Sequence, residues 1–557
     1  MRTRGNKLIT SCILLFTMVA PYFAVPGSAA VPEPDLRLDQ KVQSAFALGH
    51  EEYDVIAFFK KSDTSAIEQT LSKPASTMNR EMLVHQYIGD LRQAAAISQN
   101  GAIRLLETAK KRGDVKSYES AYIVNAIHVV GSKESILSLA KDPNIETIRL
   151  NEKRRMIDPV KTMEADPLDS NISWNVKMLN SPGVWNDFQI DGTGTTVGII
   201  DSGVEFGHPA LKRKWRGYDA ATDTIVEPEK NWFEAIPSYF IEQSPIPEDT
   251  QLSHGTHVAG IILGSEESGL NQVGVAPGAK YIAARTFDST GNTDDFILIR
   301  AGEWMLAPGG DVNARPDVVN CSWADGNLTR EWYRDIVKAW RTAGIVPVFA
   351  AGNARPGDNG VGAYSIENPA NYKEAFAVGA VNKNYRLGGF SKKGPSIFEK
   401  EQPVKGIKPD IAAPGVAIRS SIVGKGYALK DGTSMAAPHI TGTVALLRQA
   451  NPGLTVSEIE EIIKTTAKPG VDEDEPTSPN MSYGYGIVDT YAAVSKALNK
   501  GSITIQGNVL VAGEDTDRYR TARNLMLISR ILIGLNKEQA SNHLTEIQSN
   551  CLMLVLY

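Results

Sequence analysis

Short apolar runs without polar alternation recur along the middle of this chain, and amphipathic segments at residues 294–306 and 329–343 lie between them. Strands that are apolar on both faces and separated by helices are typical of a parallel sheet covered on both sides. The pattern therefore predicts a doubly wound α/β domain over residues 172–498. Its expected strands lie at residues 197–200, 280–285, 318–322, 345–351 and 375–381.

Before residue 151, strand-like and helix-like segments alternate over about 100 residues. This arrangement predicts a small α+β domain. Strands are expected at residues 52–60, 122–130 and 145–150, and helices at residues 66–71, 78–112 and 133–141. Residues 151–171, here called the linker, are charged, contain two prolines and lack apolar periodicity. Such composition indicates an exposed connection between domains, and we expect precursor processing there.

The first thirty residues have the pattern of an export signal. Basic residues open the chain, residues 8–20 are apolar, and Ser28 and Ala30 stand at −3 and −1 of a cleavage site. A membrane anchor is the alternative, but the apolar run is short and prolines follow it. We expect a signal peptide at residues 1–30, a secreted product of bacterial type, and no membrane span after signal removal. Residues 499–557 form a tail to which the sequence assigns no role.

Composition narrows the class of protein. Hydrophobic residues make up 42% and charged residues 22% of the chain, as in soluble globular proteins. The formal net charge of −6 gives no basic excess, which argues against nucleic acid as a partner. Three cysteines are too few for a disulfide framework. We expect Cys321, which follows an apolar run, to be a small buried residue rather than a nucleophile.

Three segments carry residues suited to nucleophilic catalysis. Asp201 ends an apolar strand in TTVGIIDSGVEFGHPAL, His254 begins a helix in SHGTHVAGI, and Ser434 begins one in DGTSMAAPHITGTVALL. A serine hydroxyl needs a neighbouring base to take its proton, and that base needs a carboxylate to fix its tautomer. Strand ends and helix starts of a parallel sheet meet at its carboxyl edge, so the three side chains can converge there.

Each segment alone has an ordinary interpretation. Asp-Ser-Gly after a strand is often a turn, and Gly-Thr-Ser-Met can be a helix cap. His-x-x-His can bind a metal, but no glutamate lies between the two histidines as in zinc-peptidase helices. The three segments together, in this order, favour catalysis.

All three segments resemble those of the subtilisin-type serine proteases, the subtilases, and the resemblance covers residues 172–498. It implies that Asp201 orients the imidazole, that His254 is general base and then acid, and that Ser434 attacks the scissile carbonyl. VPVFAAGNARPG resembles the subtilase segment with the oxyanion asparagine, which implies that Asn353 stabilises the oxyanion. Stretches such as GVAPGAKYIAAR and PANYKEAFAVGAV most resemble the bacillopeptidase F group of that family.

The resemblance also implies how a peptide would bind. A substrate would add as an extended strand along CSWADG. The implied substrate-binding residues are Ser322, Trp323, Ala324, Ala350 and Gly352. Glu367 in SIENPANY would lie near the floor of the primary specificity pocket, where small residues are usual. A carboxylate there would favour Arg or Lys at the cleaved bond.

The remaining expectations concern partners and ions. YIVNAIHVVGSKESILSLAKDPNIETIRLNE resembles subtilase propeptides, so residues 31–160 are expected to act as an intramolecular inhibitor and folding helper. The chemistry needs no cofactor. A structural Ca²⁺ ion is left open, because Ala210 replaces the aspartate of a common subtilase calcium site, whereas the acidic pairs Glu266–Glu267 and Asp294–Asp295 offer oxygen ligands.

The expected product is a monomeric endopeptidase acting on proteins or peptides. Another acyl hydrolase and a non-catalytic binding module on the same fold remain as alternatives. An esterase would have no use for an extended substrate edge, and no Gly-x-Ser-x-Gly surrounds Ser434. Loss of a triad residue would have favoured a binding module, and none is missing.

Overall fold

In the computed structural model, the described residues are 37–61, 63–73, 77–156, 159–165, 171–237, 244–355, 360–399, 406–472 and 477–501. The predicted signal peptide and nearly all of the C-terminal tail lie outside this range. None of the described helices is both long and apolar enough to cross a membrane.

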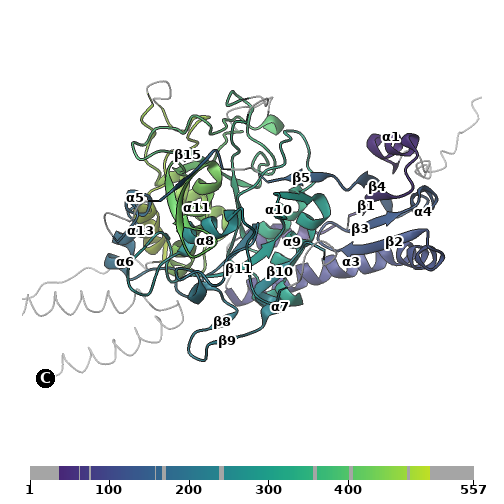
Figure 1. Cartoon of the computed structure of the whole chain (residues 1–557), viewed down its shortest axis with the longest axis horizontal. Helices are drawn as coiled ribbons and strands as arrows, with labels where there is room; N and C mark the ends of the chain where they lie inside the picture. Colours follow the sequence, from purple (N-terminus) through teal and green to yellow (C-terminus); the bar gives the residue numbers. More distant parts are fainter. Residues whose placement is uncertain are drawn as a thin grey trace, which may run out of the picture.

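A seven-stranded parallel sheet is the centre of the C-terminal part, which we call the α/β domain (Figure 1). In spatial order its strands are β10 (Trp232–Glu234), β11 (Lys280–Arg285), β7 (Thr196–Asp201), β13 (Val318–Cys321), β14 (Val346–Ala350), β15 (Phe376–Val381) and β16 (Ile411–Pro414). The prediction of a doubly wound α/β domain is confirmed. The strands β10 and β16 at the two edges were not predicted, since neither forms a long apolar run.

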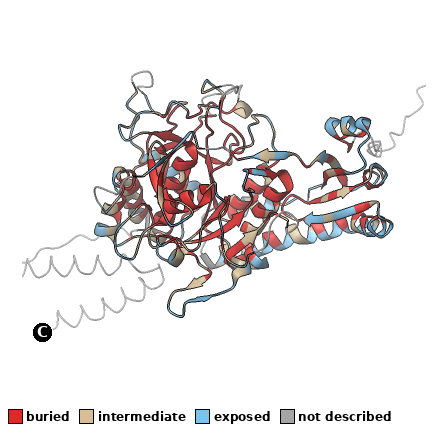
Figure 2. Cartoon of the chain, in the orientation of Figure 1, coloured by how far each residue is buried: buried red, intermediate tan, exposed pale blue. Residues whose placement is uncertain are grey.

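Helices cover both faces of this sheet. One face carries α8 (His254–Leu263), α11 (Thr433–Ala450), α12 (Val456–Thr465) and α13 (Thr490–Gly501), and the other carries α9 (Asp295–Leu306) and α10 (Arg334–Thr342). Neighbouring strand residues enter opposite cores: Ile199 packs with the first group and Ile200 with the second. Every residue of α8 is buried, which explains why all of its residues except His254 and His257 are small or apolar (Figure 2).

The N-terminal unit, residues 37–156, is a four-stranded antiparallel sheet with helices. The strand order is β2 (Val115–Ala121), β3 (Ala126–Gly131), β1 (Tyr53–Phe59) and β4 (Ile145–Leu150). Its helices are α1 (Gln40–Leu48), α2 (Ser65–Leu71), α3 (Thr77–Arg112) and α4 (Lys133–Leu139). Strand β2 was not predicted because its side chains are mostly exposed.

The two units share a hydrophobic core. Ile56 of β1, Val84 and Tyr87 of α3, and Ile123 pack with residues of α9 and α10. The second half of α3 instead packs within the N-terminal unit, where Leu106 joins the unit's own core. The 36-residue helix α3 therefore extends from one unit onto the other (Figure 1). Polar contacts at this end include a hydrogen bond between His85 and Asn313 of 2.9 Å.

Candidate active site

Asp201 and His254 form a buried pair at the carboxyl end of the sheet. Asp201 is the last residue of β7, and His254 is the first residue of α8. Nδ1 of His254 donates to Oδ1 of Asp201 over 2.7 Å, and the same oxygen accepts the backbone N–H of Ser202. Nε2 of His254 is buried and has no hydrogen-bond partner among the described residues. One ring nitrogen is thus fixed by a carboxylate, and the other is left for a reacting group.

A glycine allows this helix start to approach the strand end. A Cβ atom on Gly255 would lie 2.0 Å from the carbonyl oxygen of Gly203 and 3.1 Å from Cβ of Asp201. The backbone N–H of Gly255 donates to Oγ of Ser202. Any side chain at this position would therefore push His254 away from Asp201, which explains the glycine in SHGTH.

Ser434 lies in the first turn of α11, which packs against α8. Its hydroxyl donates to the carbonyl of Ser322 over 3.0 Å, and Oγ of Ser322 donates to the carbonyl of Ser434 over 2.9 Å. No hydrogen bond joins Ser434 to His254 among the described residues. The hydroxyl must rotate from the carbonyl toward Nε2 before a proton can pass between them.

Asn353 follows β14 and presents one end of its amide to α11. Its Oδ1 accepts the backbone N–H of Thr433 over 2.9 Å and the hydroxyl of Thr433 over 2.8 Å. This fixes the amide and leaves Nδ2 buried without a partner among the described residues. Nδ2 lies 3.2 Å from the position of a Cβ on Gly432. A buried, unpaired donor next to Ser434 is the arrangement that an oxyanion requires.

Similarity to known proteins establishes the family of this chain. The model of the subtilase family of peptidases matches residues 192–486. The chain belongs to the subtilase family. It is 39% identical to bacillopeptidase F of Bacillus subtilis over 549 residues, which covers 92% of this chain but only 37% of that protein. It is 27% identical to subtilisin E of Bacillus subtilis over 70% of this chain and 87% of that protein.

Of the residues predicted to bind substrate, Ser322 exchanges two hydrogen bonds with Ser434. Ser322, Trp323 and Ala324 follow β13 and are buried, and Ala350 ends β14 next to Asn353. Gly352 has a φ of 105°, and a Cβ there would lie 3.3 Å from the Glu367 side chain. Glu367 thus lies directly behind the segment predicted to form the primary pocket.

Glu367 is already paired with a cation that the sequence did not single out. Nζ of Lys392 lies 2.6 Å from Oε1 of Glu367, and both side chains are only 4% exposed. Arg355 lies 3.3 Å from the other oxygen. The negative charge of Glu367 is therefore balanced within the protein. The preference of the pocket for substrates with Arg or Lys at the cleaved bond stays a prediction.

The linker pairs with two strands of the α/β domain, although no backbone pairing between the linker and the predicted substrate edge CSWADG occurs in the described part of the chain. Strand β5 (Lys153–Arg155) of the linker pairs antiparallel with β12 (Asn292–Asp294), and β6 (Lys161–Glu164) pairs antiparallel with β18 (Tyr427–Asp431). The N–H of Met156 donates to the carbonyl of Gly291, and the N–H of Val160 donates to the carbonyl of Asp431.

These two contacts lie near the candidate catalytic residues. A Cβ on Gly291 would lie 3.7 Å from both Met156 and Leu252, and Leu252 precedes His254 by two residues. Asp431 precedes Ser434 by three residues.

A buried lysine beside His254 was missed at the sequence level. Nζ of Lys430 donates to the carbonyls of Leu252 and Ser253 over 3.0 and 3.1 Å. Burial lowers the pKa of Lys430 to about 8, although the carboxylates of Asp249 and Asp201 oppose this shift. Burial alternates along YALKD in β18, so that Ala428 and Lys430 point inward. This period of two residues could have indicated a buried lysine from the sequence.

His257, the second histidine of the His-x-x-His pattern, and residues of the two acidic pairs considered as Ca²⁺ ligands have partners within the protein. Nε2 of His257 contacts the carbonyl of Ala428, and burial lowers its pKa well below the usual value. Asp294 caps α9 through Ile297, and Glu266 binds Asn271 and Tyr427. No cluster of three or more metal-binding side chains occurs in the described part of the chain.

Proposed function

We propose that this chain is a secreted serine endopeptidase that acts through an acyl-enzyme on Ser434 and is made as a self-processing zymogen. The observation that carries the proposal is the buried imidazole of His254, which is fixed by Asp201 on one side and unpaired on the other. Membership of the subtilase family supports the same reaction.

The proposed chemistry follows from the positions of these groups. The hydroxyl of Ser434 turns to Nε2 of His254, gives up its proton and attacks the peptide carbonyl. The oxyanion is held by Nδ2 of Asn353 and the backbone N–H of Ser434. His254, now cationic and stabilised by Asp201, returns the proton to the leaving amine, and water then releases the acyl group by the same route.

A protein substrate is favoured over a small ester because the linker already pairs with the α/β domain as an extended strand. The backbone pairing of β5 with β12 is that of an extended peptide added to a sheet edge. An esterase would not need this edge, and a binding module would not need the unpaired Nε2 acceptor of His254 or the unpaired Nδ2 donor of Asn353.

The activity test uses the secreted full-length chain with casein as substrate. Wild type should hydrolyse casein, and a serine-directed sulfonyl fluoride should stop the reaction and label Ser434, as read by peptide mass spectrometry. Absence of casein hydrolysis, or a label on another residue with Ser434 unmodified, would refute the proposal.

The zymogen part of the proposal predicts where the chain is first cut. Because Met156 is held beside the segment that leads to His254 and Val160 beside the segment that leads to Ser434, the scissile bond should lie between them. We expect the earliest new N-terminus to fall after Met156 and no later than Val160, as measured by N-terminal mass spectrometry at short times. A first cut elsewhere in the linker would show that these strands do not define the processing site.

The ion pair at the pocket floor leads to a prediction about side-chain preference. In Lys392→Met the carboxylate of Glu367 loses its buried partner, so cleavage after Arg or Lys should gain about tenfold relative to Leu. Peptide substrates that differ only at this residue measure the ratio of kcat/KM values. Lys393→Met, the same charge change one residue later, is the control and should leave the ratio unchanged. An unchanged ratio in both variants would place Glu367 outside the specificity pocket.

A further inference from the structure

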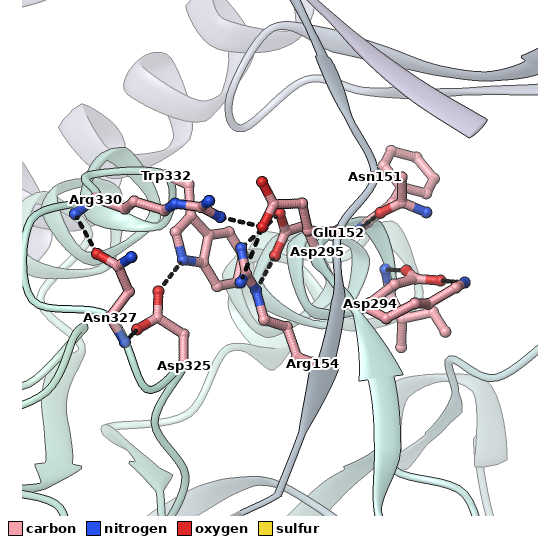
Figure 3. A network of polar contacts seen from close by, with 12 residues as sticks. Asn151, Glu152, Arg154, Asp294, Asp295, Asp325, Asn327, Arg330 and Trp332 are labelled. Atoms are coloured by element: carbon pink, nitrogen blue, oxygen red, sulfur yellow. Dashed lines mark hydrogen bonds and ion pairs between the residues drawn. The ribbon is translucent and has the colours of Figure 1, made fainter. Parts of the chain in front are cut away.

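An arginine of the linker is buried in the α/β domain. In β5, Lys153 is 69% exposed, whereas the side chain of Arg154 is 9% exposed. Nε and Nη2 of Arg154 lie 2.6 and 3.0 Å from the two carboxylate oxygens of Asp295 (Figure 3). This bidentate geometry binds a guanidinium specifically.

An aromatic ring and a second carboxylate complete the pocket around Arg154. Its guanidinium carbon lies 5.4 Å from the centre of the Trp332 ring. Nε1 of Trp332 donates to Oδ2 of Asp325 over 2.7 Å, so Asp325 holds the ring in place. The negative charge of Asp325 also acts on Arg154. We call Asp295, Asp325 and Trp332 the arginine pocket (Figure 3).

The charges at the mouth of this pocket are paired separately. Glu152 of the linker forms an ion pair with Arg330 and another with Lys41, and its contact with Arg154 is longer, at 3.4 Å. The guanidinium therefore faces the buried carboxyl of Asp295 and the half-buried carboxyl of Asp325. A buried carboxylate without a partner is costly, so the pocket has most to gain from a cation that fits it.

We propose that the arginine pocket is a substrate subsite that selects arginine two residues before the position occupied by Met156. This rests on the proposed function, in which the linker lies in the cleft as a substrate does. Antiparallel pairing with β12 sets which side chain enters: Arg154 is opposite Thr293 and points inward, whereas its neighbours point outward. Lysine would fit less well, because it cannot bind a carboxylate bidentately or stack its charge on Trp332 in the same way.

The pocket belongs to the α/β domain and would remain after the linker leaves. Asp295 lies in the first turn of α9, and Asp325 and Trp332 lie between β13 and α10. An acidic residue in a first helical turn is ordinary, but the guanidinium that Asp295 binds comes from a different segment of the chain. A protein substrate with an arginine in the same register would make the same contacts.

The test uses the processed enzyme and quenched fluorescent peptides with the sequence of residues 150–162. Arg154 is kept, or replaced by citrulline, lysine or leucine, while all other positions stay constant. Citrulline keeps the shape of arginine without its charge, and kcat/KM should fall about 100-fold, as expected for loss of a buried charged pair. Mass spectrometry of the products verifies that the same bond is cut in each peptide.

Enzyme variants separate the subsite from a general charge effect. Asp295→Asn and, independently, Asp325→Asn should lower kcat/KM for the arginine peptide and leave the leucine peptide within about threefold. Glu267→Gln, which removes an exposed charge, should preserve the preference. Equal cleavage of the arginine and citrulline peptides by wild type would overturn the subsite. Failure to cleave any peptide or casein would instead count against the proposed function.

The pH dependence gives a second readout. Burial raises the pKa of Asp295 to about 6 and that of Asp325 to about 6, against the opposing charge of Arg154. As the pH falls through about 6 both carboxyls gain protons and lose their attraction for a cation. Glu152, which pairs with Arg330, also acts on Asp295, and the charge of Glu367 acts on Asp325. The ratio of arginine to citrulline rates should therefore shrink between pH 7 and pH 5, and a ratio that stays constant would contradict the subsite.

Discussion

Ser434→Ala is expected to leave the precursor at full length and to abolish casein hydrolysis. The substitution removes the only atom that can form the acyl-enzyme while leaving the fold intact, because a methyl group fits where the serine side chain is buried. The rate should fall by at least about 10⁵-fold, the order found when a triad serine is removed from a subtilisin. Gel electrophoresis of the secreted product and casein hydrolysis, followed side by side with wild type, measure both effects.

Ser268→Ala, which changes a serine of an exposed turn, is the matched control and should mature as wild type does. If Ser434→Ala matured alone at the normal rate, another protease would perform the processing and the zymogen would not cut itself. If it still hydrolysed casein, Ser434 would not be the nucleophile.

The sequence predicted the centre of the fold well because that part is dominated by local patterns. Strands β7, β11 and β15 are buried on both faces, so each appears as an uninterrupted apolar run. Asp201 and Ser434 lie at the ends of such elements, where a turn and a helix start can be recognised from neighbouring glycines. Cys321 is buried as predicted, and burial raises its pKa well above the usual value, which suits an inert thiol.

Ion pairs between distant segments could not be predicted in this way. Lys392 and Glu367 are 25 residues apart in the sequence, and Arg154 and Asp295 are 141 residues apart. In the sequence these residues resemble the charged residues of any surface. Only tertiary structure shows that each is almost completely buried, and a buried charge needs a partner of opposite sign.

If the linker binds as a substrate strand, as proposed, the same contacts serve recognition and inhibition. A peptide that makes the contacts of Arg154 and Met156 would then inhibit the enzyme until it is cut. The contacts of Ile56, Val84 and Ile123 with α9 and α10 add affinity that a substrate lacks. The N-terminal unit should therefore remain bound after the first cut and delay full activity.

Asn353→Leu is expected to lower kcat by about 10²–10³ while KM stays within a few-fold. The magnitude is that of the corresponding asparagine in a subtilisin, where the donor meets charge only in the transition state. Thr433→Val is the matched control: it removes the hydroxyl that binds Oδ1 of Asn353 but retains the Nδ2 donor, so its loss should be clearly smaller. Steady-state kinetics on one peptide give kcat and KM separately for both variants. A rise in KM with unchanged kcat would mean that Asn353 binds the substrate in its ground state, and the oxyanion would then need a different donor.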